Sequence, residues 1–244
     1  MSTTAPEPAL PALSEPQRLL CTFADPAKAM TDLRRNASWW APWLLISIVS
    51  IAFAFTVDQR VGWGQVLETQ VLSNPKAAQR MESMSAAQQD KMEKVQETTA
   101  RILGYASPIT VLLWLAVMAL LLMAVFNFGF GEKIGFRQMM AVAAYGSLPT
   151  VINSLLSIMV LFFVSADTFD IKNPLASSVG YFVPNSMPFW KSALGTFDVF
   201  ALWQIFLLAI GVSQLGKVRR LTAFATIFGL YFALKLIGAG LSLM

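Results

Sequence analysis

The 244-residue chain contains no histidine and a single cysteine, Cys21. Without histidine, the Ser-His-Asp and Cys-His catalytic systems and imidazole metal sites are excluded. A lone cysteine makes neither an internal disulfide nor a zinc site, and on the cytoplasmic side of a membrane it stays reduced. The stretch GFGEKIG (residues 129–135) lacks the Lys-Ser/Thr ending of a phosphate-binding loop, so we interpret it as a turn.

Carboxylates offer no better basis for catalysis. Asp167, Asp170 and Asp198 are expected near one surface, without the enclosed surroundings that a carboxylate-pair enzyme needs. We therefore predict that the protein is not an enzyme and that it has no cofactor and no metal.

Charged residues are scarce as well: they make up 13% of the chain against 56% hydrophobic residues, and the mean hydropathy is +0.58. Soluble domains are about 25% charged. The apolar residues come in long blocks, and a block of about 18 or more predicts a membrane span, because only a helix satisfies its own backbone in lipid. The opening MSTTAPEPALPALS has no basic start and no apolar run, so we expect no cleavable signal peptide.

The predicted fold class is all-α: a polytopic membrane helix bundle with five transmembrane helices, an N-terminal interfacial helix and a helical outer loop. The expected spans are 42–57, 108–126, 139–164, 197–215 and 221–243. We divide the chain into a disordered tail (1–14), cytoplasmic interfacial helices (15–40) and a five-span membrane domain (41–244). Within that domain, the 58–107 loop is expected to be extracytoplasmic and helical.

Lysine and arginine gather in three short segments at one set of span ends: Arg34 and Arg35, Lys133 and Arg137, and Lys217, Arg219 and Arg220. Short loops rich in these residues stay in the cytoplasm. This pattern predicts a cytoplasmic N-terminus and an extracytoplasmic C-terminus in a bacterial cytoplasmic (inner) membrane. The net charge of +4 then matches anionic lipid headgroups, and no basic, water-exposed face suggests nucleic-acid binding.

Two capping signals mark N-terminal helices. Ser14-x-x-Gln17 is a capping box, and Asp25-Pro26 is an N-cap followed by proline. The second helix has an apolar face next to a tryptophan cluster; these residues are Ala29, Met30 and Leu33, and the interfacial anchors Trp39, Trp40 and Trp43. We predict that residues 16–35 lie along the cytoplasmic interface with the apolar face toward lipid. A plain solvated helix is the alternative.

The outer loop carries a weak apolar stripe at helical spacing: Met81, Met84, Gln88, Met92, Val95, Thr99 and Ile102. Such a stripe more often packs against its own neighbours, but methionine-rich stripes also bind partner proteins. Both interpretations stay open.

Polar residues within the spans need a reason, because they are costly in lipid. In the third span, Tyr145, Pro149 and Asn153 lie four apart. Pro149 frees the carbonyl of Tyr145 and predicts a kink, and Asn153 could fill the gap or bond a neighbouring helix. A kinked packing helix is favoured over a hinge that lines a solute path.

The last two spans hold further candidates. Gln204 and Gly211 share a face of the fourth span, and Ala225, Gly229 and Ala233 form a small-residue stripe on the fifth, suited to close helix contact. Asp198 and Lys235 lie at similar distances from the intervening turn, so two antiparallel helices would bring them to one height and allow an ion pair. Alternatively, Asp198 caps its own helix while Lys235 extends to the interface.

Three stretches, FADPAKAMTDLRRNASWWAPWLL (23–45), FNFGFGEKIGFRQMMAVAAYGSLPTVI (126–152) and FDVFALWQIFLLAIGVSQLGKVRR (197–220), resemble the bacterial branch of the Yip-domain membrane proteins. The resemblance extends over roughly residues 20–240. It implies five spans with a cytoplasmic N-terminus, and no catalytic residues carry over. Eukaryotic members bind Rab-type GTPases in vesicle traffic. This chain has a shorter N-terminal tail and only a weak match, Gly104–Pro108, to their Tyr-Gly-Pro element, which argues against a GTPase partner.

Two functional classes follow. The first is a non-catalytic scaffold that organises the bilayer or recruits a protein partner through its cytoplasmic helix or its outer loop. The second is a small solute or ion transporter or channel component. The scaffold is favoured because ion-coupled carriers usually keep an acidic residue near mid-membrane, and none is found here. The lipid bilayer is the one certain partner class, and the sequence also admits a homo-oligomer.

Overall fold

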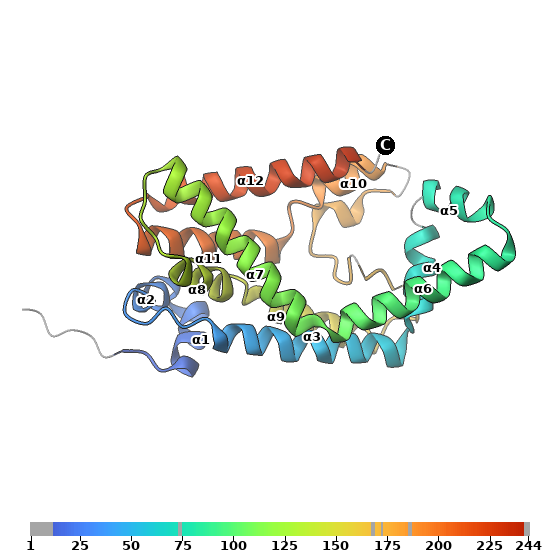
Figure 1. The fold of residues 1–244 in the computed structure, drawn as a ribbon, viewed down its shortest axis with the longest axis horizontal. Helices are drawn as coiled ribbons and strands as arrows, with labels where there is room; N and C mark the ends of the chain where they lie inside the picture. Colours follow the sequence, from blue (N-terminus) through green and yellow to red (C-terminus); the bar gives the residue numbers. More distant parts are fainter. Residues whose placement is uncertain (1–11, 73–74, 167–168, 172, 185–186, 242–244) are drawn as a thin grey trace, which may run out of the picture.

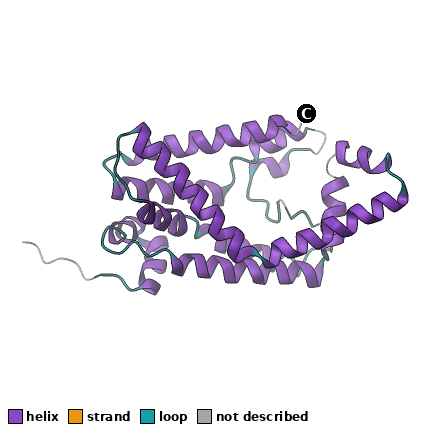
Figure 2. Ribbon diagram, in the orientation of Figure 1, coloured by secondary structure: helices purple, strands orange, loops and turns teal. Residues whose placement is uncertain are grey.

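Helices account for nearly all of the regular structure. The computed structural model describes residues 12–241 except 73–74, 167–168, 172 and 185–186, and these described residues form no strand (Figure 2). Residues 1–11 of the expected tail lie outside this set. The all-helical class predicted from the sequence is confirmed.

The two N-terminal helices begin where their capping signals predict. Helix α1 is Glu15–Ala24, and the backbone N–H of Ser14 donates to Gln17 Oε1 at 3.0 Å, as in a capping box. Helix α2 is Pro26–Asp32, and the side chain of Asp25 accepts from the Lys28 N–H at 3.1 Å. These two short helices lie together at one end of the molecule (Figure 1).

Four helical segments are long and apolar enough to cross a membrane: Trp40–Arg60, Ser107–Gly129, Phe136–Val160 and Arg220–Gly238. They comprise α3 (Trp40–Arg60), α7 (Ser107–Met123) with the π-helix η1 (Ala124–Gly129), α8 (Phe136–Gly146) with α9 (Pro149–Val160), and α12 (Arg220–Leu241). The remaining expected span is α11, Val199–Leu215. Its 17 residues measure about 26 Å, less than the hydrocarbon core of about 30 Å.

The 58–107 segment is helical where it is described, as predicted, and comprises α4 (Trp63–Leu72), α5 (Pro75–Glu82) and α6 (Ala86–Tyr105). It lies at the end of the molecule opposite α1 and α2 (Figure 1). Arg101 pairs with Asp58 at the end of α3 at 3.1 Å, and the Tyr105 hydroxyl donates to the same carboxylate at 3.0 Å. The buried side chain of Trp63 packs directly on Gly104. A Cβ at Gly104 would come 2.8 Å from the Trp63 ring, which is too close. These contacts fasten α4 and α6 to α3.

The described residues between α9 and α11 include a 3-10 turn, η3 (Val179–Phe182), and helix α10 (Pro188–Leu194). Helix α10 packs against α12 and η3. Gly180 lies against the backbone of Lys191 and Gly195, where no side chain would fit. The segment therefore folds back onto the bundle.

The core sits around α8. Residues 139–149 of the chain are all buried, and α8 packs against α7 and α11. Close approach of α8 and α11 depends on Gly146, because a Cβ there would come 2.5 Å from Leu208 Cδ2. Helix α2 also packs against α11.

The apolar face of α2 is buried by protein, which corrects one expectation. Ala29, Met30 and Leu33 are at most 1% exposed and belong to or adjoin the main core. The face was expected to contact lipid, but α11 covers it. On α1, by contrast, Leu20 is 72% exposed. If these helices lie at the interface, α1 supplies the lipid-facing side chain.

Candidate functional site

A buried charged cluster joins the N-terminal helices to the core. Arg18 of α1 is 1% exposed, and its guanidinium donates to Asp32 Oδ2 through Nε (2.9 Å) and Nη2 (2.7 Å). Its Nη1 pairs with Glu15 at 3.2 Å, and its Nη2 donates to the Leu13 carbonyl at 3.3 Å. We call Glu15, Arg18, Asp32 and Tyr145 the Arg18 cluster.

Tyr145 connects this cluster to the bundle. It is a fully buried residue of α8, and its hydroxyl donates to Glu15 Oε2 at 2.8 Å and accepts from Arg18 Nη1 at 3.4 Å. The Arg18 guanidinium carbon also lies 5.8 Å from the tyrosine ring centroid, within cation–π range. Helices α1, α2 and α8 are therefore held by one hydrogen-bonded network.

Arg18 stays positively charged although it is buried, as its ion pair with Asp32 requires. Burial alone would lower the pKa of its guanidinium, but the hydrogen bonds with Tyr145 and Asp32 outweigh burial and raise the pKa above its usual value. A charge buried this deeply is tolerable only when paired, so removing either partner leaves an uncompensated ion.

Sequence reasoning identified Tyr145 but not Glu15, Arg18 or Asp32. Asp32 was expected away from the Ala29–Leu33 face, because adjacent residues such as Asp32 and Leu33 do not share a face of a helix. For Arg18, a cation in a capped helix is typical of a solvated surface, and no local pattern indicates burial.

The helix is interrupted where Pro149 predicted a kink. The chain leaves the helix at Ser147 and Leu148, and α9 restarts at Pro149. The Leu148 N–H donates to the Tyr145 carbonyl at 3.2 Å. The local backbone thus fills the gap for which Asn153 was a candidate. The described residues provide no hydrogen bond to the half-buried Asn153 side chain, whose backbone carbonyl accepts from Ser157 Oγ at 2.8 Å.

Gln204 bonds across helices at the same level. Its Nε2 donates to Ser147 Oγ at 3.0 Å, and Met118 Sδ of α7 lies 3.9 Å away. Gly211, seven residues on, allows close packing: a Cβ there would come 2.6 Å from Val142 Cγ1 and 3.2 Å from Met30 Sδ. This face of α11 therefore serves helix packing.

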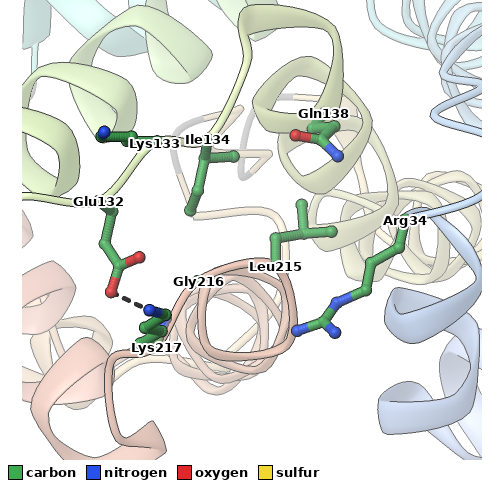
Figure 3. Close-up of a pocket in the computed structure, with 8 residues that line it drawn as sticks. All are labelled: Arg34, Glu132, Lys133, Ile134, Gln138, Leu215, Gly216 and Lys217. Atoms are coloured by element: carbon green, nitrogen blue, oxygen red, sulfur yellow. Dashed lines mark hydrogen bonds between the residues drawn. The ribbon is translucent and has the colours of Figure 1, made fainter.

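At the same end of the molecule as α2, three segments line an open cavity of about 450 Å³, and its cations Arg34, Lys133 and Lys217 are exposed (Figure 3). It is lined by Arg34, Glu132, Lys133, Ile134, Gln138, Leu215, Gly216 and Lys217; we call it the basic cavity. Arg34 Nε donates to the Gln214 carbonyl at 2.6 Å, and Glu132 accepts from the backbone N–H of Lys217 at 2.8 Å. Arg137 of α8 donates to the Ala37 carbonyl at 3.3 Å and so connects α8 to the segment between α2 and α3. Basic segments that are far apart in the sequence thus converge.

The sequence was compared with models of known protein families. The model of the Yip1 domain family matches residues 20–242, nearly the whole chain. The chain belongs to the Yip1 domain family. No curated protein and no solved structure matches it. With its long apolar helices, this Yip1-domain protein is a multi-pass integral membrane protein, and the family is not an enzymatic one.

The Yip1-domain chain does not form the direct Asp198–Lys235 ion pair. Both residues are described, and no contact within 4.0 Å joins them. Asp198 instead caps α11 by accepting from the Ala201 N–H at 2.9 Å, and it also accepts from the Ser177 hydroxyl. The exposed Lys235 lies 5.6 Å from the Tyr231 ring centroid on its own helix. Asp198 therefore caps its own helix, as the alternative predicted.

The small-residue stripe of α12 faces away from the rest of the Yip1 domain. Ala225, Gly229 and Ala233 are exposed, and a Cβ at Gly229 would meet nothing within 4 Å. Helix α12 packs through Ala223 and Ile227 instead. The predicted contact of this stripe with another helix would therefore need a helix from a second molecule, and it stays a prediction.

The tryptophans at the start of α3 have different surroundings. Trp40 is 52% exposed, as an interfacial anchor would be. Trp43 donates from Nε1 to the Pro108 carbonyl at 3.0 Å, and its ring meets Trp39 edge-on at 6.2 Å. Trp39 and Trp43 therefore connect α3 to the core, and Trp40 is the one of the three that faces outward.

Asp167, one of the three carboxylates considered for catalysis, lies outside the described residues. Among the residues that are described, no group of three or more acidic or cysteine side chains could hold a metal ion. In the 58–107 segment, α6 has no buried residue, and Val95 and Ile102 are 58% and 61% exposed. These two members of the stripe do not pack against their own chain, so partner binding there stays a prediction.

Proposed function

We propose that this Yip1-domain protein is a non-catalytic membrane scaffold that organises the bilayer or recruits a protein partner at its ends. One observation carries the proposal: two polar side chains inside the bundle, Tyr145 of α8 and Gln204 of α11, are each bonded to another helical segment. Gln204 bonds Ser147, and Tyr145 bonds Glu15 and Arg18. Polar groups used in this way fasten helices together and are not available to line a solute path.

The orientation we propose is N-terminus in the cytoplasm. Arg34, Lys133 and Lys217 meet around one cavity, and this convergence supports placing that end on the cytoplasmic side. Helix α12 leads away from it toward the end that carries α10 and α5 (Figure 1). If α11 crosses the bilayer together with the four longer segments, the C-terminus is extracytoplasmic, in keeping with a bacterial inner-membrane protein.

The experiment has two readouts. Purified protein in liposomes should give no flux of ions or small solutes above protein-free vesicles. In native membranes, a photo-crosslinking amino acid at Lys28 or at Val95, both exposed, should capture a protein, whereas the same group at Leu113, exposed on the apolar α7, should capture lipid. Flux through the reconstituted protein would reject the scaffold.

A transporter or channel component is the second candidate, and the broken span favours it. Discontinuous membrane helices often surround substrate sites, and here the interruption at Ser147–Leu148 ends five residues before Asn153, whose side chain is half-buried. Should flux be observed, Asn153→Leu tests this candidate: the flux should fall while the unfolding temperature stays close to that of the parent.

A further inference from the structure

The basic cavity collects positive charge that the described chain does not neutralise. Arg34 follows α2, Lys133 precedes α8, and Lys217 lies between α11 and α12 (Figure 3). None of these three cations has a carboxylate partner within 4.0 Å among the described residues. Glu132 is the one acid in the lining, so the four charged side chains sum to two positive charges.

The hydrogen bonds around the cavity leave the charged groups of its three cations able to bind an anion. Glu132 is occupied by the Lys217 backbone N–H. Arg34 is fixed through Nε to the Gln214 carbonyl, and its two terminal nitrogens have no hydrogen-bond acceptor among the described residues. The neighbouring carbonyl of Val212 accepts from the Gly216 N–H at 2.8 Å. Two carbonyls at the C-terminal end of α11, which would otherwise repel an anion, are therefore already paired.

The remaining lining indicates what kind of anion fits. Ile134 is buried and Leu215 half-buried, so the cations stand beside apolar side chains at the ends of membrane helices. A volume of about 450 Å³ is large enough for a phosphate group with its ester substituents. Basic pockets between membrane helices suit lipid headgroups, with each cation contributing about 1 kcal/mol in an anionic surface.

We propose that the basic cavity is a binding site for a phosphate ester, with Arg34, Lys133 and Lys217 as its ligands. Two sources have this chemistry: the headgroup of an anionic phospholipid and a soluble phosphate compound. The apolar walls favour the headgroup. Binding there would join the segment after α2 to the α7–α8 and α11–α12 turns.

The test uses the full chain purified in a neutral detergent. Its thermal unfolding is followed while phosphatidylglycerol, phosphatidylcholine or inorganic phosphate is added. Phosphatidylglycerol should raise the unfolding temperature in a saturable way, and phosphatidylcholine should not. Lys133→Gln and Lys217→Gln should each weaken binding about 5-fold, and the double variant about 30-fold. Saturation by inorganic phosphate at similar concentrations would instead identify a soluble phosphate ligand in the same cavity.

Three control variants distinguish specific binding in the basic cavity from non-specific attraction to the positive surface. Arg219→Gln removes an exposed cation at the same end but outside the lining, and Lys91→Gln removes one from α6; neither should change binding. Glu132→Gln keeps the acceptor for the Lys217 N–H and removes the negative charge, so binding should tighten about 5-fold. Equal loss in Arg219→Gln and the cavity variants, or no tightening in Glu132→Gln, would overturn the proposal.

Discussion

Replacing Arg18 with methionine should release α1 and α2 from the bundle. Arg18 donates five hydrogen bonds, and its removal leaves the Asp32 carboxylate, 7% exposed, without its ion partner. Breaking a buried pair from one side costs about 3–5 kcal/mol. The equilibrium between docked and released helices should then shift by roughly 150- to 5,000-fold toward release.

Cysteine accessibility measures this shift directly. Thr22 of α1 is fully buried, and Cys21 is the only cysteine of the chain. A cysteine at position 22, in a Cys21→Ser background, should react with a maleimide slowly in the parent and much faster in Arg18→Met. Lys28→Met provides a matched control, because it removes an exposed cation from the neighbouring helix.

The double variant Arg18→Met/Asp32→Leu tests whether the unpaired Asp32 charge causes the release. Replacing both ions with apolar side chains removes the uncompensated charge, and such replacements are often neutral. Reactivity should therefore return most of the way to the parent rate. If Arg18→Met reacts no faster than the control, or if the double variant is as reactive as the single one, the cluster does not hold the N-terminal helices.

Three further outcomes are expected. Gly146→Ala should lower the free energy of unfolding by about 1–3 kcal/mol through overpacking against α11, whereas Gly229→Ala should be neutral or stabilising in a monomer; a loss at Gly229 would indicate a buried contact with a second chain. Asp198→Ala should cost about 1 kcal/mol as a lost helix cap, Lys235→Met close to nothing, and the two should add; coupling beyond about 0.5 kcal/mol would contradict the capping assignment. A spin label at Leu20 should show lipid exposure, and one on the buried face of α2 should not; equal exposure of both would argue against the docked arrangement.

The helices were predictable from the sequence, but the contacts of their faces were not. The second span was expected at 108–126 and is found at Ser107–Gly129, because apolar length and Pro108 are local signals. Amphipathic spacing correctly indicated that Ala29 and Leu33 are buried from water. Spacing cannot distinguish lipid from protein as the apolar surroundings, so the packing of α2 on α11 was missed.

The sequence also did not show how α11 and α12 are rotated about their own axes. Equal distance from a turn suggests that Asp198 and Lys235 reach one height, but it does not say where their side chains point. Burial of Arg18 was beyond reach for a related reason: its partner Tyr145 lies 127 residues away in the sequence. Long-range placement of this kind depends on the whole bundle.

The buried third span has a consequence for how the protein enters a membrane. The segment Phe136–Val160 has the lowest mean hydropathy of the four long segments, and 67% of its apolar window is buried within the protein. Its main cover, α11, is synthesised only after the 161–198 segment. During synthesis, this span must therefore enter lipid while much of its final packing surface is still missing. Variants that make it slightly more polar should appear first as insertion failures in the cell, even where the finished fold would accommodate them.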